Sequence, residues 1–201
     1  RESTTTNTGI VERAITGLNE SIAFRQDTRT NLVAYSEDFS NGFWTKSGAT
    51  ITSGFLSPSG ELSAFKLTSN GGGNILSRPS ITLNTAHATS IYLKRVSGTG
   101  DVSIFKTNGN EQITTLTDEW QRFTCVNSVN PSNAYMGVRL YGLNDEILIY
   151  GAQLEQNSYA TSYIYTNGAA VTVDSNSTSV VNNTGIVERP ITGVNTSDAL
   201  F

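Results

Sequence analysis

The chain has 201 residues, a formal net charge of -4, 37% hydrophobic residues and 15% charged residues. Its 1 cysteine excludes a disulfide-built scaffold, and it has no apolar run near the roughly 18 residues that a membrane helix needs. The acidic balance argues against a nucleic-acid binder, which usually carries a basic face. β-Branched and small polar residues outweigh strong helix formers, so we expect an all-β domain.

The first feature along the chain is a short segment that recurs near its end. Residues 7–17 read NTGIVERAITG and residues 183–193 read NTGIVERPITG, so only Ala14 and Pro190 differ. The copies lie 176 residues apart, which is too far for a solenoid repeat. Two interpretations fit: a joint between modules of a tandem array, which we favour, or a terminal element used twice in one architecture. Pro190 suits a joint because it fixes φ and donates no ladder hydrogen bond.

Between the two copies, apolar and polar residues alternate in short runs that predict strands. The clearest run is 88–96, where Tyr92 and Lys94 share one face of the strand. Gly-Gly-Gly at 71–73 is typical of a turn, and 143–147 is the one place where we expect a helical turn. Strands of this length and spacing indicate a β-sandwich. The predicted strands are residues 31–35, 49–53, 62–68, 88–96, 101–107, 110–116, 119–127, 133–141 and 146–153.

Four stretches within residues 28–173 resemble a known type of module. They are NLVAYSEDFSNGFWTKSGATITSG, ATSIYLKRVSG, LTDEWQRFT and ILIYGAQLEQNSYATSYIYTNGAAVT, in this order. The module is common in bacteriophage tail-fibre and head-spike proteins, and it is similar to jelly-roll carbohydrate-binding modules of the xylan- and glucan-binding kind. The resemblance implies a jelly roll, a virion or secreted setting and no catalysis. It does not supply a ligand.

The fold class we predict is therefore all-β, a jelly-roll β-sandwich with short connector segments at both ends. The connectors are residues 1–30 and 174–201, which hold the two TGIVER copies, and the sandwich is residues 31–173. Because the sequence starts at Arg1, we expect it to be a mature product or a piece of a longer protein. The resemblance also implies that other copies of the chain are partners, in a homotrimer.

The candidate ligand-binding residues are aromatic and basic. Tyr135, Arg139 and Tyr141 have one parity, so they line one face if their strand is regular. A concave sheet face with these side chains would suit a glycan, and the alternative is a surface buried against a neighbouring subunit. Trp44 would either stack on a sugar or pack against the sandwich edge. We expect a structural role for Trp120.

Adjacent acidic residues could suggest hydrolytic chemistry. Neighbours on a strand point to opposite faces, so they cannot flank one glycosidic bond, and we expect solvated turn charges. The pairs are Glu37-Asp38, Asp118-Glu119 and Asp145-Glu146. The resemblance adds a calcium prediction for Glu37 and Asp38, since similar carbohydrate modules hold a structural calcium between the opening loop and the last strand. The aspartate expected near Gly151 is missing, because Ala152 and Gln153 follow there.

We expect no enzyme. His87 is the 1 histidine and is expected in a solvent-facing loop, and Cys125 is expected as a buried, reduced thiol. The predicted function is a structural and adhesive module of a phage-like fibre, spike or capsid decoration on the virion surface, with surface glycans as a candidate ligand. Other virion proteins are expected partners, without nucleic acid, membrane insertion or a cofactor other than calcium. The alternative is a carbohydrate-binding module of a large secreted bacterial enzyme or adhesin.

Overall fold

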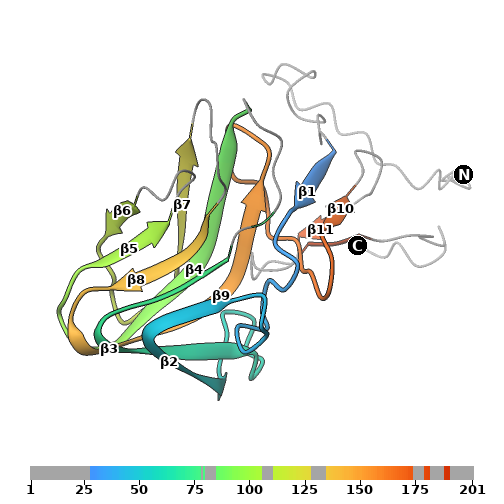
Figure 1. Ribbon diagram of the computed structural model, residues 1–201. Coiled ribbons are helices and arrows are strands. Elements are labelled where there is room, and N and C mark those ends of the chain that lie inside the picture. The colour runs from blue at the N-terminus through green and yellow to red at the C-terminus, as the bar shows by residue number, and fades with distance from the viewer. Residues whose placement is uncertain are drawn as a thin grey trace, which may run out of the picture.

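The computed structural model describes residues 28–77, 79, 85–105, 111–127, 135–173, 179–181 and 188–190. Every element in this part of the chain is a β-strand (Figure 1), and none is a helix able to cross a membrane. The first TGIVER copy and most of the second lie outside the described residues. The strands are β1 (Arg29–Asn31), β2 (Thr45–Phe55), β3 (Ala64–Ser77), β4 (His87–Ser97), β5 (Val102–Phe105), β6 (Glu111–Thr114), β7 (Gln121–Asn127), β8 (Met136–Leu140), β9 (Leu143–Glu155), β10 (Val171–Val173), β11 (Ser179–Val181) and β12 (Glu188–Pro190).

The long strand β3 joins the two layers of the sandwich. Its N-terminal half pairs with β9 and its C-terminal half pairs with β8. One layer therefore has the order β3-β9-β4-β7 and the other the order β3-β8-β5-β6, while β2 pairs along β3. The pairs β1-β10 and β11-β12 form separate two-stranded sheets. This strand order is that of a jelly roll, so the predicted fold class is confirmed.

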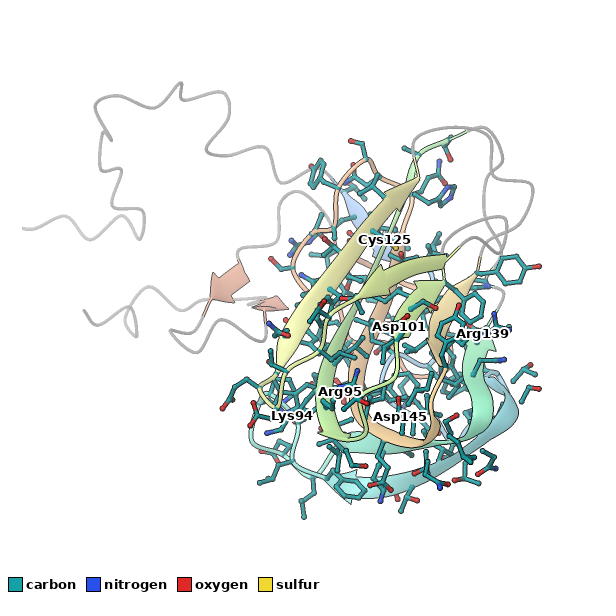
Figure 2. All side chains as sticks on the ribbon, turned by 90° about the vertical axis from the view of Figure 1, so that its left-hand side faces the viewer. Lys94, Arg95, Asp101, Cys125, Arg139 and Asp145 are labelled. Atoms are coloured by element: carbon teal, nitrogen blue, oxygen red, sulfur yellow. The ribbon has the colours of Figure 1, made fainter. Side chains whose placement is uncertain are left out.

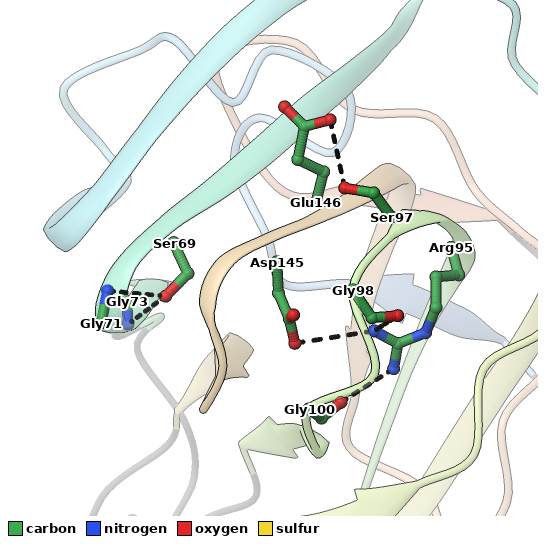
Figure 3. A network of polar contacts seen from close by, with 9 residues as sticks. All are labelled: Ser69, Gly71, Gly73, Arg95, Ser97, Gly98, Gly100, Asp145 and Glu146. Carbon is green, nitrogen blue, oxygen red and sulfur yellow. Dashed lines mark hydrogen bonds and ion pairs between the residues drawn. The ribbon is translucent and has the colours of Figure 1, made fainter.

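The predicted turn at 71–73 is wrong, because the three glycines lie within β3. Gly71 and Gly72 have φ of 98° and 73°, a conformation that bends the strand and favours glycine. The Ser69 hydroxyl oxygen accepts hydrogen bonds from the amides of Gly71 and Gly73, both at 3.1 Å (Figure 3). The glycines thus let one strand pass from the first layer to the second.

The predicted helical turn at 143–147 is also wrong, because this segment begins β9. Asp145, expected as a solvated turn charge, is 3% exposed and lies 3.6 Å from a guanidinium nitrogen of Arg95. Gly98 and Gly142 pack so closely around the Asp145 carboxylate that a Cβ on either would clash with it. Figure 3 shows Gly98 and Arg95 beside Asp145. The ion pair with Arg95 offsets part of the cost of burying this charge.

The core lies between the two layers, and β4 and β8 contribute apolar side chains to it at alternate positions. Met136, Val138 and Leu140 of β8 are fully buried, as are Ile91 and Leu93 of β4. This alternation agrees with the parity predicted for both strands. The prediction of a buried, reduced cysteine is confirmed, since the free thiol of β7 is 3% exposed (Figure 2 labels Cys125).

The histidine prediction is wrong. His87 is the first residue of β4 and is fully buried, with its Nδ1 3.0 Å from the carbonyl oxygen of Thr85. Burial lowers the pKa of His87. The start of this strand looks like a loop in the sequence, because His87 pairs with Asn127 of β7, which is distant along the chain.

Asn31 is the centre of a buried polar network that ties the opening segment to the end of β9. Its side-chain amide donates to the carbonyl oxygens of Ala152 and Ile164, at 3.1 and 2.8 Å. Its side-chain oxygen accepts from the amides of Val33 and Leu154, at 3.1 and 3.2 Å. The first and the last of the four stretches that carry the resemblance are therefore joined by hydrogen bonds in the core.

The same network continues into the segment after β9. Gln153, fully buried, donates to the Glu155 carboxylate at 2.7 Å and to the Ser162 carbonyl oxygen at 3.1 Å. Glu155 is 1% exposed and accepts hydrogen bonds from the amide and hydroxyl of Thr161. Each of these buried polar side chains has its partners, as a stable core requires.

Candidate functional site

Three of the residues predicted to bind a ligand lie together on the outer face of β8. Alternate residues of this strand point into the core, so Arg139 points away from it, and Tyr135 and Tyr141 flank the strand. Tyr141 is 46% exposed, while Tyr135 and Arg139 are half-buried. The sequence parity therefore placed these three residues correctly.

A fourth residue, Phe105 of β5, completes a row that the sequence did not reveal. The Arg139 guanidinium lies 5.8 Å from the Phe105 ring centre and 5.6 Å from that of Tyr141. The rings of Phe105 and Tyr135 are 6.5 Å apart with 32° between their planes. We call Tyr135, Phe105, Arg139 and Tyr141 the arginine–aromatic row. Cation–π contact on two rings holds the guanidinium in place.

Polar side chains continue this face across the neighbouring strands. Asn74 of β3 and Ser103 of β5 lie opposite Arg139 in the strand register, on either side of it. Ser47 of β2 lies opposite Asn74 and is exposed. Ser103 is fully buried, so the amide of Asn74, the guanidinium of Arg139 and the hydroxyl of Ser47 share one surface with the exposed Tyr141 ring. Sequence reasoning missed Asn74 and Ser47, because cross-strand neighbours are set by register and leave no local pattern.

Trp44 does not belong to this face. It is 1% exposed, and its ring contacts those of Phe39 and Phe43 at centroid distances of 4.9 and 5.5 Å. Its indole nitrogen donates to the carbonyl oxygen of Tyr35 at 2.9 Å. No face of the ring is open to a sugar, so of the two roles considered for Trp44 the structure places it in packing. A buried indole with a satisfied N–H is a core residue.

Glu37 and Asp38, the predicted calcium ligands, have different partners. The Tyr163 hydroxyl donates to Glu37 at 2.9 Å, and the Asp38 carboxylate accepts from the amide and hydroxyl of Ser40. Burial and the nearby Glu37 charge raise the pKa of Tyr163 well above its usual value. Among the described residues, no three His, Cys, Asp or Glu side chains come together as metal ligands, whereas calcium takes six to eight oxygens. Calcium stays a prediction, and the function proposed for this chain does not depend on it.

No protein-family model matches the sequence, and no curated protein matches it. Solved structures resemble its fold. The CBM22-1 xylan-binding domain of Paenibacillus barcinonensis Xyn10C is 15% identical over 66% of this chain and 94% of that domain, with a TM-score of 0.45. A family 29 carbohydrate-binding module variant in complex with cellulohexaose is 12% identical over 67% of this chain and 94% of its own, with a TM-score of 0.48.

A phage protein is also among the structures with a similar fold. It is the enzymatically active domain of tailspike protein 4 of bacteriophage CBA120, which is 15% identical over 62% of this chain, with a TM-score of 0.44. The match spans 21% of that tailspike chain. These likenesses all have TM-scores below 0.5, so the jelly-roll fold of this chain rests on its own strand order.

Proposed function

We propose that this protein is a carbohydrate-binding module that does not turn over its ligand, with the ligand lying on the outer face of β8. The observation that carries the proposal is the exposed Tyr141 ring beside Arg139, whose guanidinium is held between Tyr141 and Phe105. A sugar ring offers an apolar face for the tyrosine and hydroxyl groups for the guanidinium. Sites for small ligands typically combine an aromatic or apolar surface with a small number of polar groups.

The arrangement favours binding because the cation is already oriented. A free arginine loses side-chain entropy when it orders around a ligand, and a guanidinium stacked on rings loses less of it. Asn74 and Ser47, on the neighbouring strands, add an amide and a hydroxyl within the same face. The ligand that suits this face is a chain of neutral sugars laid across β8 and β3.

The absence of turnover is part of the proposal, and the engagement of the acidic side chains supports it. Glu37 accepts from Tyr163, Asp145 pairs with Arg95, and Glu146 pairs with Lys66 at 2.7 Å. Glycoside hydrolysis needs two carboxyl groups that flank one bond. Carboxylates bound to structural partners are poorly suited to that task.

The setting we propose is a phage-like fibre, spike or capsid decoration at the virion surface, in which copies of the module assemble as a homotrimer. The repeated TGIVER segment supports a tandem arrangement, since several weak sites on one fibre bind a glycan surface by avidity. A module of a large secreted bacterial enzyme or adhesin is the alternative. Light scattering of the purified chain measures its oligomeric state, and a trimer would favour the phage-like setting over the secreted enzyme or adhesin.

The test is a glycan array followed by calorimetry with xylan- and glucan-type oligosaccharides. We expect Tyr141→Ala and Arg139→Gln each to weaken binding about tenfold, the equivalent of about 1.4 kcal/mol. Tyr159→Ala is the matched control, since Tyr159 is 50% exposed and lies outside the row. Equal binding by Tyr141→Ala and the unchanged chain, or no glycan bound at all, would refute the proposal.

A further inference from the structure

A groove of about 750 Å³ lies on the other layer of the sandwich. Tyr92 of β4 and Leu148 of β9 form part of its lining, with Trp120, just before β7. The end of β2 and the segment after it contribute the other apolar and small residues: Gly54, Phe55, Leu56, Ser57, Pro58, Gly60 and Leu62. Lys94 lines the same groove. Its volume is in the range of pockets that hold small ligands, about 300 to 1,000 Å³.

The groove and the arginine–aromatic row are on opposite sides of the core. Tyr92 and Lys94 alternate with buried residues of β4, as Arg139 alternates with buried residues of β8. β4 and β8 belong to different layers, so the core separates the two surfaces (Figure 2 labels Lys94 and Arg139). The groove is therefore a separate surface with its own chemistry.

The groove is aromatic and aliphatic on most of its surface. Tyr92 and Trp120 pack against the buried Tyr150 and Tyr163, which fixes both rings from beneath. Leu56 and Leu62 at its rim are 60% and 69% exposed. An aromatic floor that is held rigid offers stacking area at low entropic cost.

Lys94 is the charged group of this lining, which contains no carboxylate. Within the described part of the chain, its ammonium has no hydrogen-bond or ion-pair partner. The neighbouring cation, Lys66, differs in this respect, because it is 2.7 Å from Glu146 and lies over the Phe55 ring. A half-buried lysine in a largely apolar groove is suited to one negative group on a ligand.

We propose that this groove is a second binding site, which takes an acidic saccharide with a carboxylate on the sugar ring. The apolar face of the sugar would stack on Trp120 and Tyr92, and its carboxylate would accept a hydrogen bond from Lys94. This ligand differs in charge from the neutral glycan proposed for the β8 face, so each site can be tested without the other.

Trp120 provides the signal for the test. The chain has 2 tryptophans, and Trp44 is buried in the core, so a change in emission on adding a ligand reports on Trp120. Titration with galacturonate oligomers is compared with titration with neutral galactose oligomers and with benzoate. We expect the acidic oligomer to bind at least tenfold more tightly than either of the others.

A pair of lysine variants tests whether the acidic oligomer binds in the groove. Lys94→Gln is expected to weaken binding of the acidic oligomer on the order of tenfold, as the loss of one charge-assisted hydrogen bond predicts. Lys46→Gln changes the net charge equally at a lysine outside the groove, and its binding should stay within twofold of the unchanged chain. Calorimetry of Trp120→Phe tests whether the residue that gives the fluorescence signal also contributes to binding of the acidic oligomer.

Three results would overturn the proposal: equal weakening by Lys94→Gln and Lys46→Gln, no preference over the neutral oligomer, or tighter binding of benzoate. Loss of neutral-glycan binding in Tyr141→Ala, with the acidic oligomer still bound, would support both sites. Acidic-oligomer binding by the unchanged chain without any neutral-glycan binding would support the groove and refute the β8 face.

Discussion

Removal of the Asn31 side chain is the sharpest test of what holds the jelly roll closed. The residue is fully buried, and its side chain makes 4 hydrogen bonds to the main chain. Two of them satisfy the carbonyl oxygens of Ala152 and Ile164, and two satisfy the amides of Val33 and Leu154. Asn31→Ala leaves all of these main-chain groups without this partner in a buried place.

The expected cost follows from that count. A buried donor or acceptor left unsatisfied costs about 1–3 kcal/mol. At the low end of this range, the 4 contacts of Asn31 sum to about 4 kcal/mol of unfolding free energy. A domain is stable by about 5–15 kcal/mol in total, so this single change should remove about a quarter or more of the stability.

Urea denaturation, followed by fluorescence of the buried Trp44, measures the loss. The matched control is Thr30→Ala, whose hydroxyl makes an exposed hydrogen bond to Thr172 at 2.8 Å. We expect the control to lose no more than about 0.5 kcal/mol, as surface substitutions usually do. A loss below about 1 kcal/mol in Asn31→Ala, with an unchanged slope against urea, would refute this account of the network.

Three further predictions concern local contacts. Gly98→Ala should lower stability by about 2 kcal/mol in thermal melts, because Gly98 has φ of 84° and its new Cβ would clash with the Asp145 carboxylate. The hydrogen bond from Lys66 lowers the pKa of Glu146, so this pair stabilises the fold above the unfolded pKa of about 4.3 and less as the pH falls. In urea denaturation, Glu146→Gln should therefore lose less unfolding free energy than the unchanged chain as the pH falls. An equal loss in both proteins would contradict the stabilising role of the Lys66–Glu146 pair. Cys125, at 3% exposure, should react with a thiol reagent only in denaturant, and reaction in the folded chain would show an open β7.

The strands and their faces could be predicted from the sequence because alternation is a local signal. The period-2 pattern of β4 and β8 alone placed Lys94 and Arg139 on the outer sides of their strands. The glycines at 71–73 were misleading for a physical reason, since glycine permits both a turn and a bend inside a strand. Only the pairing of β3 with both β8 and β9 distinguishes the two.

Side chains that depend on distant neighbours could not be placed in this way. Asp145 has the sequence context of a turn, yet it is buried against Arg95 and Gly98, which belong to another segment. His87 is buried for a similar reason. Phe105 joins the arginine–aromatic row only through the register of β5 with β8. Burial of a polar residue is a property of the packed fold, whereas alternation is a property of one strand.

The same distinction explains why one candidate surface was visible in the sequence and the other was not. Three of the four residues of the arginine–aromatic row lie in β8 or directly beside it in the sequence. The groove instead combines β4, β9, Trp120 and the segment at and after the end of β2, which meet only in the folded chain. Charge then separates the two surfaces functionally. With a net charge of -4 the chain does not attract acidic polymers as a whole, and charges beyond about 10 Å are screened at physiological salt. Selective binding of an acidic saccharide must therefore come from a local cation, and in the groove Lys94, which lines it together with Trp120, supplies one.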